Sequence, residues 1–235
     1  AVNSAELMPG YISDLYSAFY PLSVASPALR ELHLEDHGLR WTHAPAVVGH
    51  ARDATDDDAA VIYRDIDRTA AELDRCHRGD GQRWCELFEQ WQRIKAPLLD
   101  TLFAPFPPVR GPAGLLRGLG TAEALRLLHL LLLPAGVMAE HLFGGEAARL
   151  LLLGNAMHAD VPIDAPASGV MGFLLTMLAQ DGGFPVPVGG AGQLAAAMVR
   201  RAESAGARVE CGRAVTAIEV SGDRATAVRT ADGAT

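Results

Sequence analysis

The sequence contains almost no positive charge other than arginine. Lys95 is the only lysine among 235 residues, and 20 basic residues stand against 28 acidic ones, which gives a formal net charge of −8 at pH 7. Proteins that bind nucleic acids neutralise phosphates with clustered Lys and Arg side chains. No such cluster occurs in this chain, so the charge pattern argues against a nucleic-acid partner.

Cysteine is also scarce. The three cysteines, Cys76, Cys85 and Cys211, are odd in number and stand at no metal-ligand spacing. This pattern predicts reduced thiols in a cytoplasmic compartment and no metal centre. The first residues are polar and acidic and lack the basic start of a secretory signal, so we expect no signal peptide.

Long apolar runs are lacking as well. The most apolar stretch, residues 125–139, is too short to span a bilayer and contains Arg126, His129 and Pro134. We expect it to form a buried helix. Peripheral contact with a membrane surface is the alternative.

The first sixty residues show no long helical periodicity. Prolines punctuate short extended runs such as residues 39–43, and residues 46–50 and 59–63 are expected to form two strands. The polar segment between these strands contains Asp56, Asp57 and Asp58. A solvated turn explains such a charge run better than a cation site does.

Residues 65–180 show a helical pattern. Asp65 or Asp67 is a fair N-cap for a helix that runs to about His77, and Gly79 ends it. Further helices are expected at about 121–133, 145–157 and 168–179. A stripe at steps of three and four predicts an amphipathic, core-facing helix, and its members are Trp84, Leu87, Phe88, Trp91, Ile94, Leu98 and Leu102.

The pattern changes after Phe184. An extended segment enters the glycine turn 189–193, and a helix follows with an apolar face that includes Leu194 and Met198. Gly206 stands where a left-handed C-cap is needed. Strands are then expected at 208–211, 215–220 and 225–230, the last two joined by a turn at 221–224. The fold class is therefore α+β, with an α/β part and a mainly helical part.

The glycine turn is the first candidate site. Gly189, Gly190 and Gly192 precede a helix whose first free N–H groups are expected to point outward, where they suit a phosphate or a polarised carbonyl. The spacing is neither the G-x-G-x-x-G of a dinucleotide loop nor a P-loop. A plain tight turn explains these glycines equally well.

The whole tract 184–233, FPVPVGGAGQLAAAMVRRAESAGARVECGRAVTAIEVSGDRATAVRTADG, is more specific. It resembles the flavin-binding tract of phytoene desaturase-like oxidoreductases, within the amine-oxidase and FAD-dependent superfamily. The matching features are Pro187, Gly189-Gly190, Leu194, Gly206-Ala207, Val215 and Ile218.

Two further segments resemble the same family. Residues 1–41, AVNSAELMPGYISDLYSAFYPLSVASPALRELHLEDHGLRW, look like the part that follows the first βαβ unit and continues through a Pro-Gly-Phe-x-x-Asp stretch, here residues 9–14. Residues 155–169, NAMHADVPIDAPASG, resemble the family's helical region.

The resemblance implies a partial FAD-binding domain made of residues 1–7 and 184–235, with a β-meander. Residues 8–183 would form a mostly helical substrate domain with a small sheet. The implied cofactor is FAD, and the implied reaction is oxidation or desaturation of an apolar organic substrate by hydride transfer to the flavin. The dinucleotide loop would lie upstream of Ala1 and a closing segment downstream of Thr235, so we expect an internal fragment that is inactive alone.

The resemblance also assigns contacts with the flavin. Asn3 and Ser4 would approach the isoalloxazine, although Asn3 stands where relatives often have Arg. Gly189 and Gly190 would face the ring or the substrate, and Val215 would contact the adenine side through its backbone. No acid or base stands out as a catalytic residue, because the flavin carries the redox chemistry and the protein positions the partners.

Other polar residues have simpler explanations. His33 and His37 lack the Glu that a zincin motif places directly after its first His, so a surface turn is expected. His158 with Asp160 is either a dyad near a substrate or a histidine at a helix C-terminus. A non-catalytic helical module that binds an apolar ligand or a partner remains the alternative function, and the sequence does not determine the oligomeric state.

Overall fold

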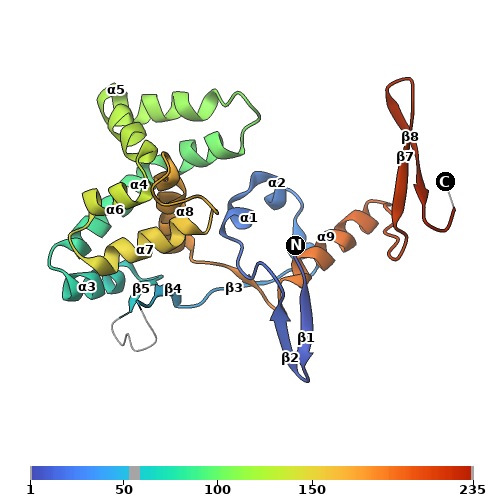
Figure 1. The fold of residues 1–235 in the computed structure, drawn as a ribbon, viewed down its shortest axis with the longest axis horizontal. Coiled ribbons are helices and arrows are strands. Elements are labelled where there is room, and N and C mark those ends of the chain that lie inside the picture. The colour runs from blue at the N-terminus through green and yellow to red at the C-terminus, as the bar shows by residue number, and fades with distance from the viewer. Residues whose placement is uncertain (1, 53–58, 234–235) are drawn as a thin grey trace.

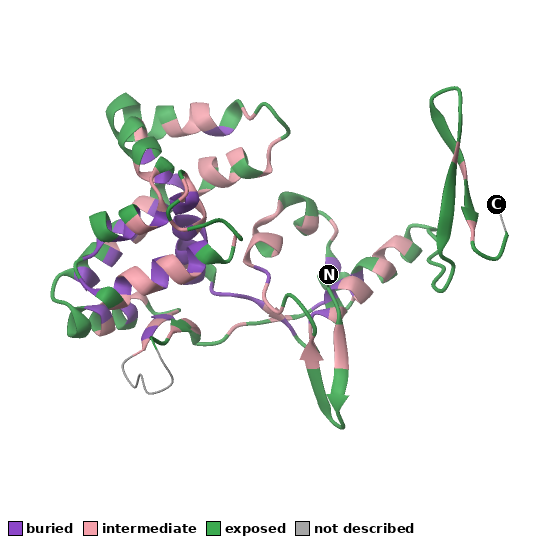
Figure 2. Cartoon of the chain, in the orientation of Figure 1, coloured by how far each residue is buried: buried purple, intermediate pink, exposed green. Residues whose placement is uncertain are grey.

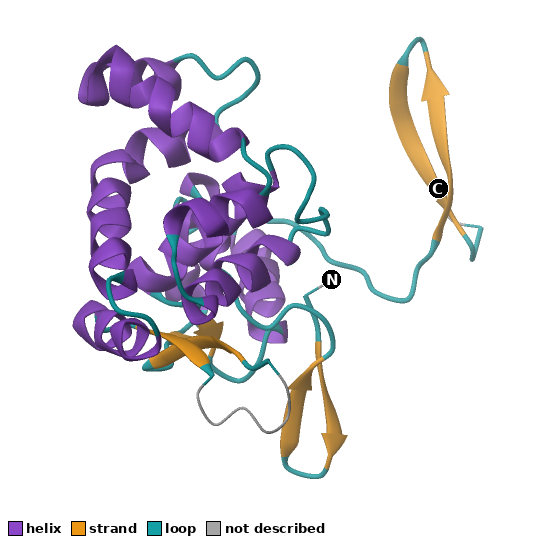
Figure 3. Ribbon diagram, turned by 60° about the vertical axis from the view of Figure 1, so that its left-hand side comes forward, coloured by secondary structure: helices purple, strands orange, loops and turns teal. Residues whose placement is uncertain are grey.

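A computed structural model describes residues 2–52 and 59–233. The chain is a mixed α+β protein in which a helical body occupies the middle of the sequence (Figure 3). Four two-stranded antiparallel sheets account for the strands of the described residues. The triple Asp56, Asp57 and Asp58 lies outside those residues.

The helical body consists of six helices, four of which pack directly on or next to the most buried one, α8 (Ser168–Gly182). The other five are α3 (Ile66–Cys76), α4 (Asp80–Phe103), α5 (Arg110–Leu132), α6 (Ala135–Leu142) and α7 (Glu146–Met157). Eleven of the fifteen residues of α8 are buried, and it contacts α4, α5, α6 and α7. The hairpin of β4 (Ala46–His50) and β5 (Ala60–Tyr63) packs against α3, α7 and α8. Burial of this apolar surface is the main source of stability.

Most of the predicted helices of this body are confirmed. The side chain of Asp65 caps α3 by accepting from the backbone N–H groups of Asp67 and Arg68. On α4, Trp84, Trp91 and Ile94 are fully buried, as the stripe predicted. Trp91 packs edge-on against Phe173 of α8, with ring centroids 6.1 Å apart.

The helix expected at about 121–133 is confirmed, because Gly120 has non-helical angles (φ 75°, ψ 166°) and separates the part of α5 that ends at Leu132 from an earlier helical part, residues 110–119, that was not expected. One expectation about this region is wrong. The apolar stretch 125–139 is not one helix, because Pro134 separates the end of α5 from α6. The backbone of Leu133 is already extended there.

A second, smaller apolar cluster joins the beginning of the chain to the segment after Phe184. Its buried members are Tyr20, Leu34, Leu39, Ala191, Leu194 and Ala197. They come from the region of α1 (Pro21–Ala25), α2 (Pro27–Arg30) and the 3-10 helix η1 (Leu34–His37), and from α9 (Gly192–Ser204). The short pair of β3 (Trp41–Thr42) with β6 (Val186–Pro187) ties the two segments. The proposed domain limits at residues 7 and 184 stay a prediction.

The last described element is a hairpin of β7 (Val215–Ser221) and β8 (Arg224–Thr230). It stands apart from the helical body, and its apolar side chains, among them Ile218 and Val220, are exposed (Figures 1 and 2). The predicted hairpin is confirmed. The predicted strand at 208–211 is wrong, since these residues have no regular structure; they lack the neighbouring strand whose hydrogen bonds would hold them extended.

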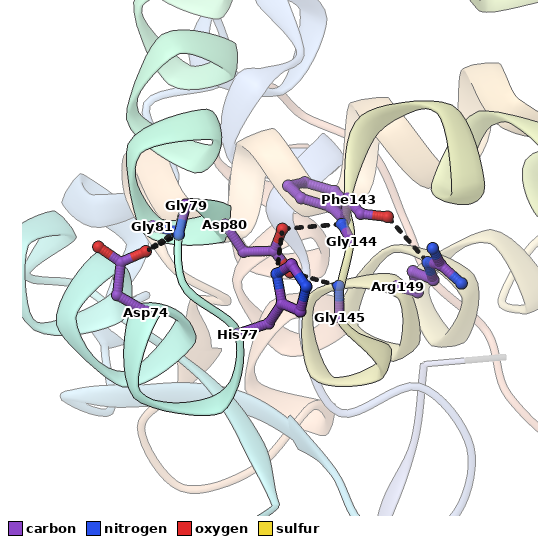
Figure 4. A network of polar contacts seen from close by, with 9 residues as sticks. All are labelled: Asp74, His77, Gly79, Asp80, Gly81, Phe143, Gly144, Gly145 and Arg149. Atoms are coloured by element: carbon purple, nitrogen blue, oxygen red, sulfur yellow. Dashed lines mark hydrogen bonds and ion pairs between the residues drawn. The ribbon is translucent and has the colours of Figure 1, made fainter.

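The buried carboxylate of Asp80 connects α4 to the link between α6 and α7 (Figure 4). Its two oxygens accept hydrogen bonds from the backbone N–H groups of Gly144 and Gly145, both at 2.8 Å. His77 lies against the same carboxylate, with Nδ1 3.5 Å from Oδ1. A Cβ on Gly144 or Gly145 would lie within 2.4 Å of His77 atoms, so only glycine permits this approach.

Replacement of Asp80 by Asn is expected to destabilise the fold by about 2–3 kcal/mol. The Asn side chain has one acceptor oxygen and one NH₂ donor, so the N–H of either Gly144 or Gly145 would face the NH₂ group and lose its acceptor. Urea unfolding followed by circular dichroism measures the change. Glu86→Gln, an exposed change on the same helix, is the control and should alter the free energy of unfolding little. Equal effects of the two substitutions would contradict the role given to Asp80.

A second polar contact fastens the C-terminal end of α8 to α4. The indole N–H of Trp84 donates to Gln180 at 2.9 Å, and that of Trp91 donates to Asp181 at 3.1 Å. Lys95 and Gln92 also donate to Asp181. Burial alone would raise the pKa of the Asp181 carboxyl, but the hydrogen bonds from Gln92, Trp91 and Lys95 and the Lys95 charge outweigh it and lower the pKa.

Because the folded-state pKa of Asp181 is lowered, its carboxylate stabilises the fold above the ordinary Asp pKa of about 3.9. This contribution is lost as the pH falls through the folded-state pKa. The difference in unfolding free energy between the protein and Asp181→Asn should therefore be largest near neutral pH and shrink below about pH 4. Urea titrations across this range test it, and a difference independent of pH would contradict the ion pair.

Candidate functional site

The first hairpin of the chain locks onto the glycine turn that precedes α9. β1 (Ser4–Met8) and β2 (Tyr11–Asp14) place Ser4 and Asp14 side by side, and the Ser4 hydroxyl donates to Asp14 Oδ1 at 2.6 Å. The same Asp14 oxygen accepts from the backbone N–H of Ala191 at 2.7 Å, and Ser4 Oγ accepts from that of Gly192 at 2.8 Å. We call these residues, together with Gly190, the glycine junction.

Gly190 makes this close approach possible. Its φ is +92°, and a Cβ there would lie 2.7 Å from Ser4 Oγ and 3.0 Å from Asp14 Oδ1. A side chain would be both strained and in collision. Gly189 also has a positive φ, +86°, but is exposed. The two glycines therefore differ: Gly190 contacts the first hairpin, whereas Gly189 faces outward from the turn.

The expected free N–H groups at the start of α9 are not free. Ala191 and Gly192 donate to Asp14 and Ser4, and Gln193 donates to the carbonyl of Gly190. A carboxylate beside a helix N-terminus already balances the positive end of the helix dipole. The expectation of an outward-facing anion site here is therefore wrong, because the chain supplies its own acceptors.

The remaining residues assigned from the resemblance lie in two places. Asn3 is exposed next to the glycine junction, and its carbonyl accepts from the backbone N–H of Leu15. Val215 is exposed on β7, in the hairpin that stands beyond the far end of α9 (Figure 1). The structure thus brings Asn3, Ser4, Gly189 and Gly190 together and leaves Val215 apart. Their role as flavin contacts stays a prediction.

Sequence reasoning missed Asp14. It was seen only as the end of the Pro-Gly-Tyr-Ile-Ser-Asp stretch, and no local pattern predicts that its carboxylate caps a helix 177 residues later. A short hairpin turn at Pro9-Gly10 was the available signal, since it allows Ser4 and Asp14 to face each other across two strands.

The histidine candidates have structural roles. His33 is the N-cap residue of the 3-10 helix η1 and His37 is its last residue, in agreement with the expected turn. His158 is the C-cap residue of α7 and stacks on Phe19, with ring centroids 5.3 Å apart. Within residues 2–52 and 59–233, no three His, Cys, Asp or Glu residues come close enough to hold a metal ion.

Two cavities are hollowed beside α4. One, of about 510 Å³, lies between α4, α5 and α6, and five leucines share its lining with polar side chains that include His129, His141, Arg83 and Arg126. The other, of about 350 Å³, lies between α1–α2 and α4–α8. Both volumes fall in the range of small-molecule sites. None of the helices in the described part of the chain has the length and apolar character needed to cross a bilayer.

Comparison with known proteins adds no assignment. No family model matches the sequence, and no curated protein is significantly similar to it.

Removal of the Asp14 carboxylate should free the first turn of α9. Asp14→Ala is expected to cost about 1–2 kcal/mol, as loss of a helix cap does, and to raise the hydrogen-exchange rates of the Ala191 and Gly192 amides. Amide exchange followed by NMR measures this change. Ser13→Ala, on the same strand, is the control and should leave those two rates unchanged; unchanged rates in Asp14→Ala would refute the cap.

Proposed function

We propose that the chain belongs to an FAD-dependent oxidoreductase similar to phytoene desaturases, which oxidises an apolar organic substrate. The glycine junction is the observation that carries this proposal. It joins the two tracts that resemble the family most, although Ser4 and Gly192 are 188 residues apart in sequence. Two tracts with the same resemblance therefore form one site.

The residues at the junction fit one edge of a flavin but not its phosphates. Asn3 and Gly189 are exposed beside the junction and can contact a planar ring with a side-chain amide and with backbone groups. The N–H groups that would hold a phosphate already have acceptors. The phosphates would therefore need residues outside this turn, as the lack of a G-x-G-x-x-G motif in the sequence also indicates.

In this proposal, FAD would accept a hydride from the substrate, and the chain would orient the two and exclude water. Ser4 and Asp14 act as positioning residues, because they hold the turn that carries Gly189 and Gly190 in one conformation. The helical body provides apolar walls, and the two cavities described above beside α4 expose more apolar than polar surface. We assign no acid or base.

The alternative, a helical module that binds an apolar ligand or partner without catalysis, is supported by the same cavities. It gives no reason for the glycine junction or for the β7–β8 hairpin. A module that needs only helices would not require a glycine with positive φ, Gly190, packed against a hairpin that is distant in sequence. The oxidoreductase proposal accounts for both features.

The test is to purify the product of the whole gene and measure its flavin. We expect FAD to be bound, seen as flavin absorbance in the folded protein and FAD fluorescence after denaturation. Gly190→Ala should lower the FAD content because its Cβ would collide with Ser4 Oγ. Gly118→Ala, where a Cβ meets open space, is the matched control. A colourless protein that takes up no added FAD would refute the proposal.

A further inference from the structure

The cavity between α1–α2 and α4–α8 lies where the helical body meets the beginning of the chain. Pro21 and Val24 form one side, Leu99 and Phe103 of α4 another, and the end of α8 with Gly183 and Pro185 the third. We call it the Lys95 cavity, because the only lysine of the sequence lines it. Its walls thus come from three parts of the chain that are distant in sequence.

The walls of the Lys95 cavity are held in place by contacts behind them. The backbone N–H of Tyr20 donates to the carbonyl of Pro185 at 2.9 Å. The ring of Phe19 stacks on that of Phe184, with centroids 4.5 Å apart and an angle of 3° between the planes. Such contacts preform a site, and preformed sites avoid the entropy cost of ordering on binding.

The apolar part of the lining suits a hydrocarbon chain. Val24, Ala25, Ala96, Leu99, Phe103 and Leu178 contribute aliphatic and aromatic surface, and three prolines add more. Removal of this surface from water favours an apolar occupant by about 25 cal/mol per Å². The polar residues that line the cavity would then determine the orientation in which such a ligand binds.

The polar residues of the cavity offer more free donors than free acceptors. Asp181 already accepts from Trp91, Gln92 and Lys95. Both hydrogen bonds of Lys95 Nζ go to that one carboxylate, at 3.1 and 3.3 Å, which leaves a third N–H. The side chain of Arg30 is exposed and makes no hydrogen bond or ion pair with any residue that the structure describes.

Two other titratable groups face the cavity. Burial and the Arg64 charge lower the pKa of His43, so its imidazole is neutral at pH 7 and adds no charge. Asp100, one turn after Ala96 on α4, is exposed, and of the two carboxylates that line the cavity it is the one that accepts no hydrogen bond from the described residues. The free donors of the cavity, which are the five N–H groups of Arg30 and the third N–H group of Lys95, outnumber this one carboxylate.

We propose that the Lys95 cavity binds an apolar molecule through a single carboxylate, which accepts hydrogen bonds from Arg30 and Lys95. Carboxylates pair well with guanidinium groups, which can donate two parallel hydrogen bonds. The hydrocarbon part lies against α1, α4 and the end of α8. That this ligand is the substrate rests on the proposed oxidoreductase function, whereas the binding itself does not.

The amino group of Lys95 allows ligand binding in the cavity to be measured directly by NMR. Reductive methylation with ¹³C-formaldehyde labels amino groups, and the NMR signal that disappears in Lys95→Arg is the one that reports on the cavity. Decanoate, added below its micelle concentration and without FAD, should shift the Lys95 signal in a saturable manner. Decylamine, with the same chain and a cationic head, should not. No shift with decanoate, or equal shifts with both, would refute the proposal.

Calorimetric titration of variants locates the site. Arg30→Gln should weaken decanoate binding about tenfold or more, since it removes a charged hydrogen-bond donor. Val24→Trp, which fills the cavity from α1, should abolish it. Arg93→Gln, an exposed change on α4 that lies away from the cavity lining, is the control. Unchanged affinity in both test variants would overturn the site. FAD is absent throughout, so this outcome is independent of the flavin proposal.

Discussion

The carboxylate of Asp14 is the point on which the candidate site depends. It accepts from the Ser4 hydroxyl and from the backbone N–H of Ala191, and so fixes the first hairpin against the start of α9. Without this acceptor, the first N–H groups of α9 would need water or a ligand. Because Gly190 lacks a Cβ, the two segments approach closely enough for these bonds. The exposed positions of Asn3 and Gly189 follow from that contact.

The helical body and the smaller apolar cluster meet along the segment 183–187. Phe184 belongs to the large core and stacks on Phe19, while Pro187 pairs with Trp41 beside the small cluster. The Lys95 cavity lies on the same segment, between Leu178 and Pro185. A ligand in this cavity would therefore touch the chain that leads directly into the glycine junction. The proposed ligand site and the turn proposed to face the flavin are thus neighbours along the chain.

Helices with a strong apolar stripe could be predicted from the sequence, and the junction could not. Trp84 and Trp91 recur at helical spacing, so their burial follows from periodicity. Pro134 is a helix-breaking residue in the sequence, but the continuous apolar run around it favours a single helix and gives no sign that α5 ends and α6 begins there. Asp14 and Arg30 carry no local signal, because their roles arise only when distant segments fold together. The expected strand at 208–211 was wrong because β-propensity needs a neighbouring strand to act.

The occupied helix N-terminus limits how a flavin can lie at the glycine junction. The side chain of Asp14 lies directly at the N-terminus of α9 and accepts from the N–H of Ala191, in the position where such N–H groups attract phosphates in other proteins. A pyrophosphate at this position would meet a carboxylate at close range and would be repelled. A neutral ring edge suffers no such repulsion and can use the exposed amide of Asn3. If FAD binds here as proposed, an edge of the isoalloxazine fits the turn better than the pyrophosphate does.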